Sequence, residues 1–100
     1  MSRYVIVVDL VTPEQTNALT SFVKAQNVAY WHWLVSAWLI VDASGNTDRD
    51  SVWWRDKFRD LLPVTANVLV LNADTGVYAA FAPKESHEWL DKIWGKGIVR

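Results

Sequence analysis

The strands that this sequence predicts are apolar on both faces, and this limits how the chain can fold. In residues 4–10 the alternation of a strand gives each face its own apolar set, Tyr4, Ile6 and Val8 on one and Val5 and Val7 on the other. Residues 38–41 and 68–71 repeat the pattern. Only two long amphipathic helices are predicted, and on an open sheet they cover one face. Something else must therefore cover the second face, because large apolar patches are rarely left in water.

The composition is that of one folded domain, residues 1–100. The hydrophobic share is 51%, and the chain contains seven Trp. A net charge of -1 gives no long-range attraction to phosphate backbones, so nucleic acid stays undecided as a partner. The absence of cysteine is typical of a reducing cytoplasm, where we expect the protein to be located. We predict no membrane association, since His32 and Ser36 interrupt the longest apolar stretch, residues 28–41.

Turn, capping and periodicity signals divide the chain into strands and helices. Strands are predicted at residues 4–10 and 67–72, with a fifth strand at 77–82. Residues 28–43 are predicted to form two antiparallel strands divided near Val35 and Ser36, or else one bent strand, because no glycine turn marks the division. Helices are predicted at residues 13–26, from Thr47 to Pro63, and from an N-cap at Ser86 to about Trp94.

This order of elements predicts an α+β fold of the ferredoxin-like class. The arrangement is the split βαβ (βαββαβ) with an added fifth strand and a short C-terminal helix, and both long helices lie on one face. The final helix is one cover for the other face, through an apolar stripe of Trp89, Leu90, Ile93 and Trp94. The same face of a second chain is the other cover, and we therefore expect a homodimer.

Three segments resemble one known family. The strand VIVVDL ending in Asp9, the segment SAWLIV, and NVLVLN followed by GVYAAF are similar to the small CRISPR-associated adaptation nucleases and their SinR-like relatives, over residues 3–82. The resemblance implies a ferredoxin-like fold, dimers formed through the sheets with the fifth strand reaching the partner, and a metal ligand at Asp9. Val8 stands where that family often has tyrosine, and the segment VTPEQTN lacks its basic residues. These departures favour assembly or partner binding over catalysis.

Asp9 is the candidate catalytic and metal-binding residue. In a dimer, two Asp9 carboxylates could hold a Mg²⁺ ion for phosphodiester hydrolysis, so whether the chain is an enzyme is left open, and its activity would be that of a metal-dependent nuclease. The alternative is an Asp9 that accepts hydrogen bonds from backbone amides in the turn before the first helix. No other cofactor is expected. The triplet from Asp74 to Gly76 is interpreted as a turn between strands rather than as an aspartic-protease motif.

Three tryptophans, Trp53, Trp89 and Trp94, are candidates for contact with a protein partner. Trp53 falls on the polar side of the second long helix, where it either meets a partner or lies flat on its own helix against Lys57. Trp89 and Trp94 belong to the stripe of the final helix.

The sequence therefore favours a small homodimeric protein that acts through assembly or partner binding. A Mg²⁺-dependent endonuclease with paired Asp9 carboxylates is the first alternative. The second is a small-ligand protein of the dimeric α+β barrel kind, with a Trp-lined pocket between sheet and helices.

Overall fold

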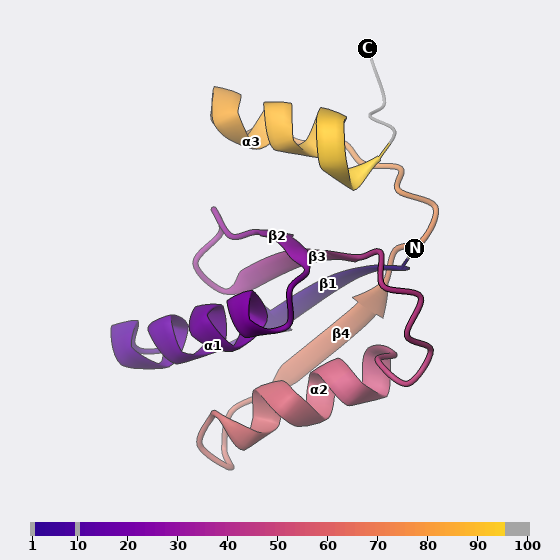
Figure 1. The fold of residues 1–100 in the computed structure, drawn as a ribbon. Helices are drawn as coiled ribbons and strands as arrows, with labels where there is room; N and C mark the ends of the chain where they lie inside the picture. The colour runs from indigo at the N-terminus through magenta and orange to yellow at the C-terminus, as the bar shows by residue number, and fades with distance from the viewer. Residues whose placement is uncertain (1, 10, 96–100) are drawn as a thin grey trace.

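The structure, a computed structural model, describes residues 2–9 and 11–95. These residues form a small α+β fold with a four-stranded antiparallel sheet and three helices (Figure 1). The strands are β1 (Ser2–Val8), β2 (Ala29–Trp31), β3 (Ala37–Asp42) and β4 (Val68–Asn72). The helices are α1 (Pro13–Ala25), α2 (Ser51–Asp60) and α3 (Lys84–Trp89), and α3 continues into the π-helical turn η1 (Leu90–Trp94). The arrangement is compatible with the ferredoxin-like class.

The strands lie in the order β2-β3-β1-β4, and each strand runs antiparallel to its neighbours. β1 and β3 are therefore central, while β2 and β4 form the edges. Residues 28–43 make two strands joined by a turn around Val35 and Ser36, rather than one bent strand.

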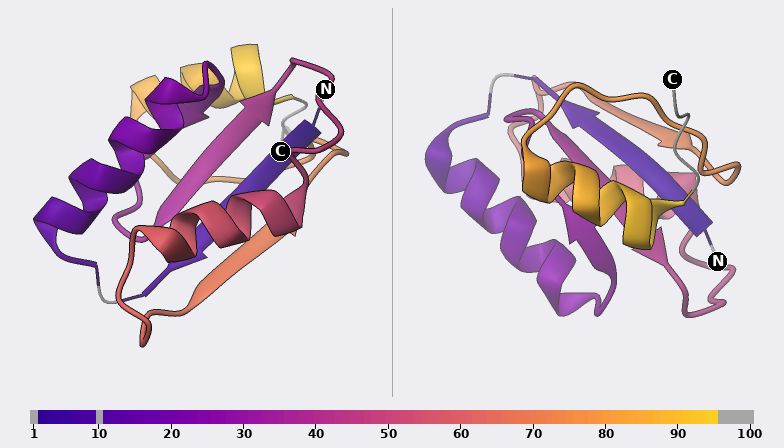
Figure 2. Two further views of the ribbon diagram at one scale, coloured as in Figure 1. Left: turned by 60° about the horizontal axis from the view of Figure 1, so that its bottom comes forward. Right: turned by 90° about the horizontal axis from the view of Figure 1, so that it is seen from above.

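The first face of the sheet is covered by α1 and α2 (Figure 2). Its core takes one set of alternate side chains from β1 and β3 and the apolar stripes of both helices, namely Tyr4, Ile6, Val8, Leu19, Val23, Trp38, Ile40, Trp54, Phe58 and Leu62. The rings of Trp38 and Phe58 meet edge to face, with their centroids 5.6 Å apart. Large aromatic side chains thus fill the space between this face and the helices.

The two long helices begin at side-chain caps. At α1 the Thr12 Oγ1 accepts a hydrogen bond from the Gln15 N–H at 3.2 Å, and Gln15 Oε1 accepts one from the Thr12 N–H at 2.9 Å, which is the capping box that the sequence predicts. At α2 the cap is Asp50, whose Oδ1 accepts from the Trp53 N–H at 2.9 Å. The predicted start at Thr47 is therefore wrong.

The residues before α2 form a loop because their polar side chains bond to the backbone of the loop itself. The Asn46 N–H donates to Ser44 Oγ at 3.1 Å, and the Asp48 N–H donates to Asn46 Oδ1 at 2.9 Å. Such local bonds compete with helix formation, so the Ser44 and Asn46 side chains stabilise turns ahead of the cap at Asp50.

The second face of the sheet is partly covered by α3 and η1, which form a third layer (Figure 1). The buried residues of this smaller core are Leu39, Val41, Trp89, Leu90 and Trp94. Within the described residues, three hydrogen bonds join the layer to the rest of the chain: the Trp31 Nε1–H donates to Ser86 Oγ at 2.8 Å, the Arg3 Nε–H to the Trp94 carbonyl, and the Tyr78 hydroxyl to Asp91. The chain thus supplies its own cover for part of this face.

Two predictions for the final helix are wrong. The helix begins at Lys84 after Pro83, and Ser86 is not its N-cap but a buried acceptor for Trp31. Ile93, placed on the buried stripe by α-helical spacing, is 42% exposed, whereas Trp94 is 2% exposed. The cause is the wider turn of η1, where the Gly95 N–H donates to the Leu90 carbonyl at 3.2 Å and shifts the buried row.

The predicted fifth strand at residues 77–82 is not present as a strand in the described residues. This segment makes a single β-bridge, at Tyr78, and otherwise forms an irregular connection to α3. The Tyr78 hydroxyl donates a hydrogen bond to Asp91, and this bond raises the pKa of Tyr78 to about 12. The hydroxyl therefore stays protonated, and the bond to Asp91 persists, through the neutral pH range. The apolar side chains Val77 and Phe81 are exposed to solvent.

Candidate functional site

Asp9 lies directly after β1 and binds Asn67, which directly precedes β4. The backbone N–H of Asn67 donates to Asp9 Oδ1 and its side-chain Nδ2–H to Oδ2, both at 2.7 Å. These bonds, the backbone one foremost, hold the pKa of Asp9 below its ordinary value of 3.8. A lowered pKa means that the charged carboxylate stabilises the fold above about pH 4 and that this contribution is lost as the pH falls.

The surroundings of Asp9 favour a structural function over metal binding. Both of its carboxylate oxygens accept hydrogen bonds within the chain. Among residues 2–9 and 11–95, no group of three or more His, Cys, Asp or Glu side chains could hold a metal ion. Mg²⁺ takes several oxygen ligands in octahedral geometry, and Asp9 alone supplies few of them.

Asp74, like Asp9, accepts a hydrogen bond from a backbone N–H. The residues from Asp74 to Gly76 form a turn after β4, as predicted, and Gly76 has a positive φ of 69° that suits glycine. Asp74 Oδ1 accepts a hydrogen bond from the Arg3 N–H at 2.8 Å, and this bond is the main reason why the pKa of Asp74 is lowered. The turn therefore joins the beginning of β1 to the end of β4.

The second face of the sheet carries apolar side chains that α3 and η1 leave uncovered. Across the β1–β4 pair Val5 lies opposite Leu71, and Val7 lies opposite Leu69, so these four side chains share this face. Leu69 is 55% and Leu71 49% exposed, while Val7 is partly buried. We call Val7, Leu69, Leu71 and the outer edge of β4 the β4 surface. It is the candidate functional site, because neighbouring half-exposed leucines on a strand favour contact with a partner.

The three tryptophans proposed for partner contact all pack within the chain. The Trp53 ring is partly buried, with its centroid 5.9 Å from that of Phe22, and the Lys57 Nζ lies 5.7 Å from the Trp53 centroid. This geometry supports the interpretation in which Trp53 lies on its own helix. Trp89 and Trp94 are 8% and 2% exposed and bury the second face of the sheet.

A buried ion pair at the end of β3 was not predicted from the sequence. Arg49 binds Asp42 through two parallel hydrogen bonds, Nε to Oδ2 and Nη2 to Oδ1, each 3.0 Å long. Its Nη1 donates to the Gln26 carbonyl at 3.0 Å after α1, and its own carbonyl accepts from the Tyr4 hydroxyl at 3.0 Å. Arg49 thus connects the loop before α2 to β1, β3 and α1.

The pKa of Asp42 reflects two opposing influences. Burial raises it, but hydrogen bonds from Ser44 and Arg49, together with the positive charge of Arg49, hold it below the ordinary value of 3.8. The pair therefore keeps its charges, and it serves the structure of the loop.

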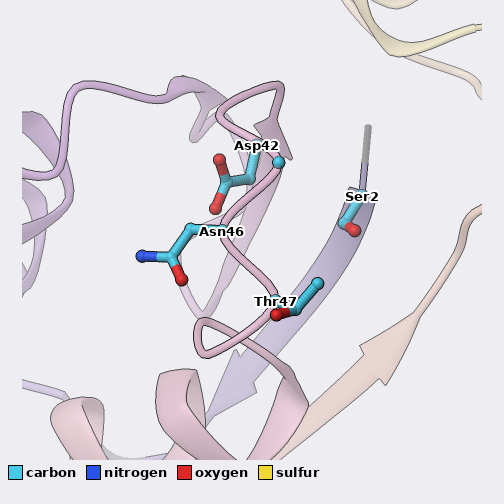
Figure 3. A pocket seen from close by; sticks show the side chains of 5 residues that line it. Ser2, Asp42, Asn46 and Thr47 are labelled. Atoms are coloured by element: carbon cyan, nitrogen blue, oxygen red, sulfur yellow. The ribbon is translucent and has the colours of Figure 1, made fainter.

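Four surface hollows found among the described residues do not suggest a site for a small organic ligand. One of about 150 Å³ is polar and lies between Ser2 of β1, Asp42 at the end of β3, and the loop residues Gly45, Asn46 and Thr47 (Figure 3). Others of about 250, 480 and 610 Å³ lie beside β4, between β2 and η1, and at the end of α2. None of the four is lined by tryptophan, whereas the ligand-binding alternative requires a Trp-lined pocket.

Comparisons with known proteins identify no family for the chain. No model of a protein family matches the sequence, and searches of curated proteins and of solved structures find no match. Among the described residues, no helix has both the length and the apolar character needed to cross a membrane.

Proposed function

We propose that this chain is a ferredoxin-like protein that acts as a homodimer, through assembly and partner contact at the β4 surface rather than through catalysis. The observation that carries the proposal is the exposure of Leu69 and Leu71, 55% and 49%, on the part of the second sheet face that α3 and η1 leave uncovered. A relationship to the small CRISPR-associated adaptation nucleases and to SinR-like proteins, and a cytoplasmic location, are parts of the same proposal. They rest on the strand motifs and on the absence of cysteine.

Wild-type protein is expected to show a dimer mass in light scattering at high micromolar concentration. A Leu69→Lys/Leu71→Lys variant is expected to be a monomer, because it replaces the exposed apolar side chains with like charges. The matched control is Val35→Lys. Val35 is 76% exposed and lies in the turn between β2 and β3, on the other side of β1 from β4. A wild type that stays monomeric up to high micromolar concentration contradicts the proposal, and so does a lysine variant that still dimerises.

The nuclease alternative has a separate test at Asp9. Purified wild type is expected to leave single- and double-stranded DNA and RNA intact in Mg²⁺ or Mn²⁺, because no group of three or more His, Cys, Asp or Glu side chains among the described residues could hold the metal ion. Metal-dependent cleavage that disappears in a folded Asp9→Asn variant, and survives in the control Asp74→Asn, would falsify the non-catalytic proposal.

A further inference from the structure

The outer edge of β4 has its backbone groups arranged for pairing with another strand. The Ala73 N–H donates to the Arg3 carbonyl at 2.8 Å, and the Asn67 carbonyl accepts from the Asp9 N–H at 3.3 Å, so Asn67 and Ala73 face β1. In an antiparallel pair, alternate residues point both backbone groups to the same side. Leu69 and Leu71 therefore also face β1. Val68, Val70 and Asn72 direct their N–H and C=O groups outward, where no other described strand pairs with β4.

This edge lacks the usual features that prevent strands from pairing between molecules. Residues 68–72 contain no proline and no charged side chain, and β4 has five residues. The other edge of the sheet is protected by its shortness, because β2 has three residues. A hollow of about 250 Å³ runs beside β4 on the side of α2, and Val52, 51% exposed, lines it together with Val68, Leu69 and Val70. Ser51 and Arg55 of α2 also line this hollow, so the edge is accessible, with apolar leucines on one side and a mixed apolar and polar strip on the other.

We infer that two copies of this chain pair through β4, antiparallel about a two-fold axis at Val70, and so join their sheets into one of eight strands. This inference rests on the proposed homodimer and specifies its geometry. The register follows from the outward groups. With Val70 opposite its own copy and Val68 opposite Asn72, every outward N–H and C=O of β4 is used, giving about six hydrogen bonds. An axis at Leu69 or Leu71 gives only about four.

A second copy suits this edge because the same register also matches the side chains. Leu69 of one copy lies directly opposite Leu71 of the other, so the four leucines form two cross-strand pairs, one on each side of the two-fold axis. No charged side chain of β4 meets a like charge, and each copy carries a net charge of only -1. A standard interface of about 800 Å² per partner is about one-eighth of the 6364 Å² surface of the chain. One strand with its flanking side chains falls below that size, so we expect dissociation in the micromolar range.

Disulfide crosslinking tests the register in a chain that has no cysteine of its own. Leu69→Cys and Leu71→Cys proteins are prepared separately, mixed to allow subunits to exchange, and oxidised. With the axis at Val70, residues 69 and 71 of different copies have Cα atoms about 4.5 Å apart, within disulfide range, whereas identical positions are about 7 to 8 Å apart. The mixture is therefore expected to yield a crosslinked dimer as the main product, and each protein alone is expected to stay uncrosslinked. Asn72→Cys serves as the negative control, because its copies lie at opposite ends of the strand pair.

The outcomes separate this inference from the proposed function. A dimer mass without crosslinking in the mixture overturns the β4 pairing but leaves the homodimer, whose interface then lies elsewhere. Crosslinking of either single variant alone overturns the register, and a monomeric wild type overturns both proposals. A Val70→Pro variant gives a second measurement. The N–H of Val70 points away from β1, so proline removes a hydrogen-bond donor of the proposed interface and is tolerated within the sheet of one chain. A variant with the wild-type circular dichroism spectrum is expected to be a monomer, and a dimer of normal strength overturns the inference.

Discussion

An Arg49→Ala variant is expected to lose about 3 to 5 kcal/mol of its free energy of unfolding, because it leaves a buried carboxylate without its cation. The side chain of Arg49 is 12% exposed and that of Asp42 4% exposed, so the pair is largely shielded from water. The variant also loses the bond from Arg49 to the Gln26 carbonyl, which connects the loop to the end of α1. Urea denaturation followed by circular dichroism at about pH 7 measures the loss.

The loss should depend on pH in a defined direction. In the wild type the pKa of Asp42 is lowered, so its charged form stabilises the fold above the ordinary value of 3.8, and this contribution disappears as the pH falls. Without Arg49, only the hydrogen bonds from Ser44 oppose the effect of burial, which raises the pKa of Asp42. The pKa of Asp42 is therefore higher in the variant than in the wild type, and protonation of Asp42 stabilises the folded variant. The difference between wild type and variant is therefore expected to be largest at neutral pH and to shrink below about pH 4.

The exposed pair between Arg55 and Asp56 provides the matched control. Its charged atoms are 2.8 Å apart, closer than those of Arg49 and Asp42, but the side chains are 47% and 52% exposed. Arg55→Ala is expected to cost less than about 1 kcal/mol, because water screens the pair and solvates the remaining charge. If Arg49→Ala costs no more than Arg55→Ala, or if its cost does not change on acidification, the structural function assigned to the buried pair is wrong.

Local signals predicted the parts of the fold that depend on local interactions. Thr12 and Gln15 are close in sequence, and their spacing alone indicated the capping box at the start of α1. The alternation in β1 indicated that both faces of the sheet are apolar, and the structure buries Tyr4 under the helices while Val5 packs against the second core. The final helix was predicted as one of two covers, and it occupies only part of the second face.

Features that depend on long-range contacts or on small shifts in helix geometry were not predictable. Asp42 and Arg49 are unremarkable polar residues in sequence, and only the loop geometry brings them together in a buried pair. Asp9 meets Asn67 58 positions away, and this contact favours a structural interpretation that the resemblance alone could not supply. The segment 77–82 has the composition of a strand, but strand formation requires a neighbour to pair with, and within the described residues only Tyr78 makes a bridge.

The second large effect is expected in the final helix, where Trp89→Ala should cost about 3 to 5 kcal/mol of the free energy of unfolding. Trp89 is 8% exposed, and its ring stacks on that of Trp31, with centroids 6.0 Å apart and an angle of 24° between the planes. Removal of the indole leaves a cavity above the sheet and exposes Leu39 and Val41, which belong to the same core. Urea denaturation in dilute solution, below the concentration at which dimers form, isolates this effect from that of association.

Ile93→Ala is the control in the same element, because the π-helical turn leaves Ile93 42% exposed. Its expected cost is well below that of Trp89→Ala, since 42% of the residue is already exposed to water. Regular α-helical spacing makes the opposite prediction, namely that Ile93 and Trp89 lie on one buried stripe and that both substitutions are costly. Equal losses for the two variants would therefore mean that the last turn is α-helical in solution. A negligible loss for both would mean that α3 does not cover the sheet, and that the whole second face is available for contact with a partner.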